Sequence, residues 1–190
     1  FAEDTIEVAI GTYSGAINLL DKNLSFRGAG APSETIIQGD GTGSVLTISG
    51  GQSTLTNISN FTIIGGGGAQ GGGIKIDGGS QPKISNLIIA SNSVSGNGGG
   101  IGVLSGGAII SNTTIGFNNA SGNGGAIYAA VGSSVSLTNS ILWGNGNTEI
   151  GSFGNVATTY STHTLNSKRV SFCRVPLFFS GFRVSIGLSL

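Results

Sequence analysis

A short motif returns at a nearly constant interval through this chain. Ile58-Ser59-Asn60 comes back as Ile84-Ser85-Asn86, Ile110-Ser111-Asn112 and Leu137-Thr138-Asn139, so that the asparagines lie 26, 26 and 27 residues apart. A second motif, Gly71-Gly72-Gly73-Ile74, returns at 98–101 and, as Gly-Gly-Ala-Ile, at 124–127. Because two independent motifs keep one period, the chain is predicted to be built from stacked repeats of about 26 residues.

Short runs of alternating apolar and polar residues fill each repeat. Such alternation is typical of β-strands with one buried face, and glycine (36 of 190 residues) would destabilise helices by about 1 kcal/mol at each position. The apolar members recur as three predicted core columns: Ile58, Ile84, Ile110 and Leu137; Ile37, Ile63, Ile89, Ile115 and Leu142; and Leu46, Ile74, Ile101 and Ile127.

One coil of this length cannot bury its apolar face alone. Stacked coils solve the problem, because each strand pairs in parallel with its counterpart in the next coil about 4.8 Å away. The sequence therefore predicts an all-β parallel β-helix over residues 1–161. Asn60, Asn86, Asn112 and Asn139 are predicted to point inward and to stack as a structural ladder that satisfies backbone groups at the corners.

The asparagine ladder, the Gly-Gly-Gly-Ile corners and the segment 139–145 (NSILWGN) resemble the right-handed parallel β-helix proteins of the pectate-lyase-like superfamily. Segments 5–13, 24–30 and 35–39 are similar to the first coils of that superfamily, and 124–127 is similar to bacterial autotransporter passenger domains. The resemblance implies a right-handed solenoid at an extracellular location, secreted or on the cell surface. It also implies either carbohydrate processing or a passive structural or adhesive role.

Charge is scarce, and this narrows the choice of partner. Only 8% of residues are charged and the net charge is zero, against about 25% in an average protein. Nucleic-acid binding is therefore not expected. No apolar run is long enough for a transmembrane helix, and no metal or other cofactor is predicted.

The repeat stops after Ser161. Residues 162–190 carry four basic residues and no acid, and their last run alternates from Phe182 to Leu190. This segment is predicted to be a separate C-terminal element. It either caps the solenoid or serves as a strand that docks on a neighbouring molecule.

The positions of the acidic residues help to distinguish an enzyme from a binding protein on this fold, because a lyase or hydrolase needs clustered carboxylates. Only Glu7 and Glu34 lie one repeat apart, in the first coils, and residues 78–148 contain no acid. Asp40 and Asp77 with Lys75 are the nearest candidate for a catalytic group, but turn roles are favoured for both acids. His163 and Cys173 lack neighbours that would make them reactive.

The outward positions form regular, uncharged columns instead. Ser59, Ser85, Ser111 and Thr138 make a hydroxyl stripe, and Thr62 and Thr114 alternate with isoleucines in a second column. These six residues are the candidate binding face. We expect a non-catalytic extracellular β-helix protein with a structural, adhesive or filament-forming role, which self-associates end to end or through residues 162–190. A polysaccharide lyase or hydrolase, or a carbohydrate-binding module, is the alternative.

Overall fold

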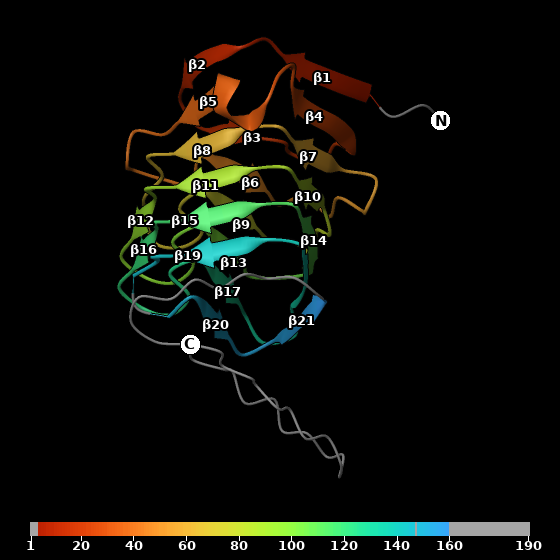
Figure 1. Ribbon diagram of the computed structural model, residues 1–190. Helices are drawn as coiled ribbons and strands as arrows, with labels where there is room; N and C mark the ends of the chain where they lie inside the picture. Colours follow the sequence, from red (N-terminus) through yellow and green to blue (C-terminus); the bar gives the residue numbers. More distant parts are fainter. Residues whose placement is uncertain (1–3, 147, 160–190) are drawn as a thin grey trace, which may run out of the picture.

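The computed structural model describes residues 4–146 and 148–159, and these residues form a parallel β-solenoid of about five turns (Figure 1). The predicted all-β fold with about 26 residues per turn is confirmed. The described part contains a single short helix, the 3-10 turn η1 (Pro32–Glu34). The predicted C-terminal element at 162–190 lies outside the described residues, as do His163 and Cys173.

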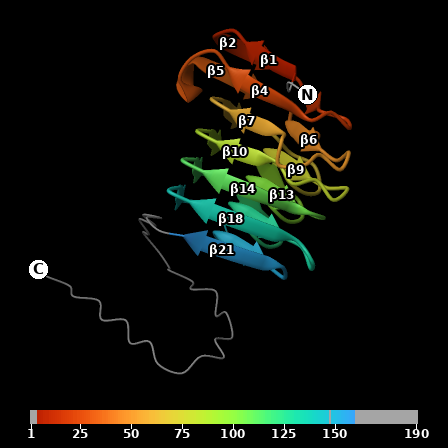
Figure 2. The ribbon, with the colours of Figure 1, turned by 90° about the vertical axis from the view of Figure 1, so that its right-hand side faces the viewer.

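Three sheets make the walls of the solenoid. The first sheet contains β1 (Asp4–Val8), β4 (Leu24–Gly28), β7 (Asn57–Ser59), β10 (Lys83–Ser85), β14 (Gly107–Ser111), β18 (Ser134–Thr138) and β21 (Asn155–Thr159). Figure 2 shows these strands stacked in that order.

The second sheet contains β2 (Gly11–Ser14), β5 (Thr35–Gln38), β8 (Thr62–Ile64), β11 (Ile88–Ala90), β15 (Thr114–Gly116) and β19 (Ile141–Trp143). The third sheet contains β3 (Ile17–Asn18), β6 (Leu46–Ile48), β9 (Ile74–Ile76), β13 (Ile101–Val103), β17 (Ile127–Ala129) and β20 (Ile150–Ser152). β12 (Ser93–Val94) pairs with β16 (Asn119–Ala120) as a short corner ladder.

Every pairing between the described strands is parallel, and the register joins equivalent positions of successive turns. Ile84 lies between Ile58 and Ile110 in the first sheet, Ile89 lies between Ile63 and Ile115 in the second, and Ile101 lies between Ile74 and Ile127 in the third. The three predicted core columns are therefore confirmed as stacks of side chains.

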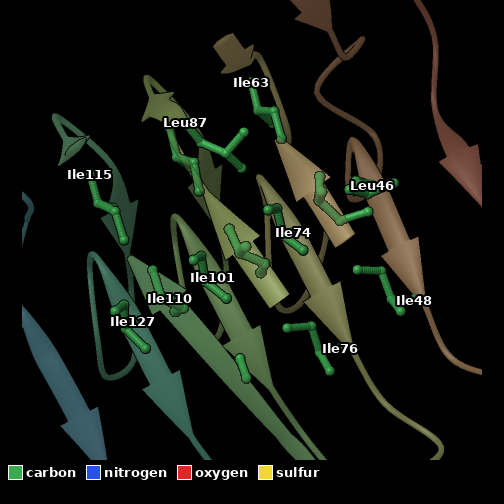
Figure 3. Packing of buried hydrophobic residues seen from close by; sticks show 14 of the residues in the cluster. Leu46, Ile48, Ile63, Ile74, Ile76, Leu87, Ile101, Ile110, Ile115 and Ile127 are labelled. Atoms are coloured by element: carbon green, nitrogen blue, oxygen red, sulfur yellow. The ribbon is translucent and has the colours of Figure 1, made fainter. Parts of the chain in front are cut away.

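These columns fill the interior of the solenoid (Figure 3). Ile58, Ile63, Ile74 and Ile101 are fully buried, and so are their partners in the neighbouring turns. Burial of one such side chain stabilises the fold by about 1.5–3 kcal/mol. In the upper turns, Phe26 and Phe61 extend the core with stacked rings whose centroids lie 4.6 Å apart.

The corners require glycine where two turns of backbone approach closely. A Cβ atom at Gly66 would overlap the carbonyl oxygen of Gly72, and a Cβ atom at Gly100 would lie 2.6 Å from the carbonyl oxygen of Ala126. Since real Cβ atoms do not come this close to backbone, these glycines allow the corner strands to pack. Among the described residues, no helix has the length and apolar character that crossing a membrane requires.

Candidate functional site

The predicted asparagine ladder exists but does not point inward. Asn60 is half-buried, and Asn86, Asn112 and Asn139 are exposed. The Nδ2 of Asn86 donates to the Oδ1 of Asn60 at 2.7 Å, and the Nδ2 of Asn139 donates to the Oδ1 of Asn112. The predicted inward orientation is therefore wrong, and these residues form an exposed column along one corner in which two pairs are joined by side-chain hydrogen bonds.

The backbone explains this outward orientation. Asn60, Asn86, Asn112 and Asn139 have φ values of 63°, 53°, 49° and 45°, in the left-handed region that asparagine tolerates better than most residues. The alternation of the strand ends one residue earlier, at Ser59 and its equivalents. Strand periodicity consequently does not apply to the asparagine that follows.

A second column of asparagines lies inside the solenoid, and the sequence reasoning missed it. Asn92 and Asn118 are each 1% exposed and Asn145 is 8% exposed. The Nδ2 of Asn92 donates to the Oδ1 of Asn118 at 2.9 Å, and the Nδ2 of Asn118 donates to the Oδ1 of Asn145 at 2.9 Å. These three residues are called the inner ladder below.

The inner ladder also satisfies the backbone where the second sheet turns a corner. The Oδ1 atoms accept from the backbone N–H of Gly66, Asn92 and Asn118, one turn earlier in each case. The Nδ2 atoms donate to the carbonyl oxygens of Ile63, Ile89 and Ile115. Each side-chain amide thus forms hydrogen bonds with buried polar groups of two turns. Without these bonds, the buried groups would be unpaired, which costs free energy.

A carboxylate ends the inner ladder. Oε2 of Glu149 accepts from the Nδ2 of Asn145 at 2.6 Å, and Oε1 accepts from its backbone N–H at 3.3 Å. Glu149 therefore takes the place that an asparagine of a further turn would occupy. The sequence does carry a signal for this ladder, because Asn92, Asn118 and Asn145 each follow an inward aliphatic residue by three positions and keep the repeat period.

The predicted hydroxyl stripe lies on the outer face of the first sheet. Ser85 is in register with Ser59 on one side and with Ser111 on the other, and Ser111 is in register with Thr138. All four residues are half-buried. The stripe continues upward into Arg27 and Glu7, whose side chains form an ion pair at 2.7 Å.

The threonine column lies on the outer face of the second sheet, where Thr62, Ile88, Thr114 and Ile141 follow one another in register. The two predicted threonines differ in exposure. The hydroxyl of Thr62 donates to the carbonyl oxygen of Pro32 at 2.9 Å, so its hydrogen is already bonded to η1. Thr114 is exposed and is the accessible hydroxyl of the pair.

An aromatic pair lies beside this column in the last two turns. The rings of Phe117 and Trp143 meet edge to face, with centroids 5.4 Å apart. Phe117 is 62% exposed and Trp143 is 42% exposed. Phe117 has φ +57°, and an ideal Cβ atom at Gly144 would lie 3.2 Å from its ring. The glycine of the next turn therefore leaves room for the phenylalanine.

The acidic residues of the described chain do not gather. Asp40 accepts from the N–H of Thr42 at 2.9 Å and from its hydroxyl at 2.6 Å, and Asp77 accepts from the N–H of Gly78. The donors from Thr42 hold the pKa of the Asp40 carboxyl below its usual value. Across the described ranges, no group of three or more His, Cys, Asp and Glu side chains is placed to hold a metal ion.

Lys75 lies in a shallow groove rather than in an acidic cluster. The groove has a volume of about 360 Å³ and is lined by Thr42, Ser44, Thr47 and Gln70, with glycines between them. Neither Asp40 nor Asp77 lines it. The groove that Lys75 lines thus contains neither of the two acids, and each acid has the local turn contacts that the sequence analysis favoured.

The fold and the outer faces together define a parallel β-solenoid protein in which the outward positions of the second-sheet strands carry no charge. Comparison with known proteins adds no closer assignment: no protein-family description, curated protein or solved structure matches this chain.

Proposed function

We propose that this protein is a non-catalytic extracellular β-solenoid, secreted or displayed on a cell surface, with a structural or adhesive role. The observation that carries the proposal is the character of the two flanks. On the second sheet, the outward positions from Thr62 to Trp143 are threonine, aliphatic, glycine and aromatic residues. Regular flat faces of this kind suit contact with an extended partner.

The arrangement of the acids supports a binding role over a catalytic one. Hydrolysis of a glycosidic bond needs two carboxyl groups that face one substrate. In the described chain, Asp40 and Asp77 contact their own turns, and Glu149 caps the inner ladder. A carbohydrate-binding module that does not cleave its ligand is the second candidate, and the exposed Phe117–Trp143 pair favours it.

We also infer a relationship to the right-handed β-helix proteins of the pectate-lyase-like superfamily. The parallel sheets, the turn length of about 26 residues and the stacked asparagines support this relationship. Polysaccharide lyases and hydrolases of that superfamily remain the enzymatic alternative for this chain.

Self-association into filaments is a further part of the proposal. β1, β2 and β3 are the outermost described strands at one end of the three sheets, and Ile6 in β1 and Tyr13 in β2 are 47% and 41% exposed. Unpaired strand edges with apolar neighbours favour head-to-tail stacking of copies. Residues 162–190, with their amphipathic final run, are the other proposed route to self-association.

The test combines turnover, binding and assembly. The 190-residue chain is incubated with pectate and with neutral plant and bacterial polysaccharides, with and without Ca²⁺, and new reducing ends are measured. We expect retention on at least one insoluble polysaccharide or cell surface without new reducing ends. Electron microscopy at high protein concentration tests the filament. Release of reducing ends would contradict the proposal, and monodisperse monomers would remove its filament-forming part.

A further inference from the structure

We propose that Phe117 and Trp143 form a stacking platform for a neutral pyranose ring of a glycan. The inference rests on the proposed binding function and assigns that function to one place on the second sheet. It starts from the conformation of Phe117, a bulky residue in the left-handed region.

Phe117 occupies a position that the fold fills differently in other turns. The equivalent residues are Gly65, Ser91 and Gly144, with φ values of 71°, 55° and 67°. All four corners therefore need the left-handed conformation, which favours glycine and disfavours bulky side chains. The phenylalanine ring is mostly exposed, so core packing does not explain it. Strain of this kind accumulates at functional sites.

The size of the platform indicates a small or narrow ligand. Aromatic side chains bury about 150–250 Å² each when covered, and Phe117 and Trp143 are 62% and 42% exposed. The pair therefore offers about 200 Å² of uncovered aromatic surface. A stable protein–protein interface needs about 800 Å² from each partner. A single sugar ring of a longer chain matches the smaller area.

The chemistry around the rings indicates a neutral ligand with hydroxyl groups. No Lys or Arg occupies an outward position on the strands of the second sheet, so a phosphate or carboxylate would lack a counter-charge there. The Thr114 hydroxyl is exposed, and the Trp143 indole N–H supplies a donor at the ring itself. A pyranose has an apolar C–H face for the ring and hydroxyl groups for such partners.

Trp143 is the sole tryptophan of the chain, so its fluorescence reports on the platform directly. The full chain is titrated with cellohexaose, xylohexaose and mannohexaose, and with trigalacturonate as the acidic comparison. We expect a saturable change in tryptophan emission with at least one neutral probe and none with trigalacturonate. The Phe117→Gly variant should lower the affinity at least tenfold.

Two controls separate loss of the platform from loss of the fold. Phe117→Gly places at this corner the residue type that Gly65 and Gly144 supply at the equivalent corners. The thermal unfolding midpoint of the variant should therefore stay close to that of the parent. Phe153→Ala removes an exposed phenylalanine that meets Tyr128 of the third sheet edge to face, and this variant should leave the affinity unchanged.

Several outcomes would overturn the assignment. They are the absence of a response to every neutral probe, equal affinity in Phe117→Gly, and a response to trigalacturonate alone. If the parent is a dimer and Phe117→Gly is a monomer, the two rings contact a second copy of the chain, and this result would also overturn the assignment. If the parent and Phe117→Gly adhere equally to a polysaccharide, the platform fails while the binding function stands. Cleavage of the polymer would instead refute the proposed function.

Discussion

Replacement of Asn118 by alanine tests the inner ladder most directly. Its side chain donates to the carbonyl oxygens of Ile89 and Gly116 at 2.9 and 3.1 Å and to the Oδ1 of Asn145 at 2.9 Å. It also accepts from the N–H and the Nδ2 of Asn92 at 3.1 and 2.9 Å. The variant removes all of these bonds from a site that is 1% exposed.

The expected cost follows from which groups lose their only partner. The Oδ1 of Asn145 still accepts from the backbone N–H of residue 118, and the Nδ2 of Asn92 still donates to Ile63. The backbone N–H of Asn92 is left buried without an acceptor, which costs about 1–3 kcal/mol, and each lost bond adds about 0.5–1.5 kcal/mol. The lower ends of these ranges add to about 3 kcal/mol over the five lost bonds, so we expect the free energy of unfolding to fall by at least about 3 kcal/mol.

A matched control lies six residues away in the same turn. Asn112 belongs to the exposed column and has φ +49°, so Asn112→Gly removes an amide from that column but keeps a residue that suits the left-handed corner. Because the lost hydrogen bond is open to solvent, this variant should cost less than about 1 kcal/mol.

Equilibrium unfolding in urea, followed by far-UV circular dichroism, measures both variants. Hydrogen exchange supplements it because solenoids can unfold in stages, and the backbone N–H of Asn92 should lose protection in Asn118→Ala. If Asn112→Gly proves as destabilising as Asn118→Ala, or if Asn118→Ala costs less than about 1 kcal/mol, the assignment of the buried ladder is wrong.

Two further predictions concern a corner and a loop. Gly66→Ala should prevent soluble expression or lower the thermal midpoint strongly, because the new Cβ atom meets the carbonyl of Gly72, whereas Gly43→Ala, which meets nothing within 4 Å, should be neutral. The pKa of Asp40 is lowered by its hydrogen bonds to Thr42, so this contact contributes stability above the carboxyl's ordinary pKa and loses it as the pH falls through the folded value. In an NMR titration, Thr42→Val should raise the pKa of Asp40; an unchanged midpoint would contradict the role of the hydroxyl.

The core of this protein was predictable from the sequence because local and global order coincide in a parallel solenoid. Alternation within a strand tells which side chains are buried, and a constant period tells which of them stack. These two patterns were sufficient to predict that Ile63, Ile89 and Ile115 are buried and stacked on one another. The uncharged outer columns followed from the same alternation.

The corners and the contacts between turns were decided by the tertiary structure. At a corner the backbone leaves the strand conformation, so alternation no longer indicates where a side chain points. For that reason Asn112 was predicted inside and lies outside, while Asn118 is buried. Three contacts depend on how successive turns are placed in space: η1 with Thr62, Glu149 with Asn145, and Phe117 with Trp143. The sequence pattern gives the spacing of residues along the chain but not the distances between side chains of neighbouring turns.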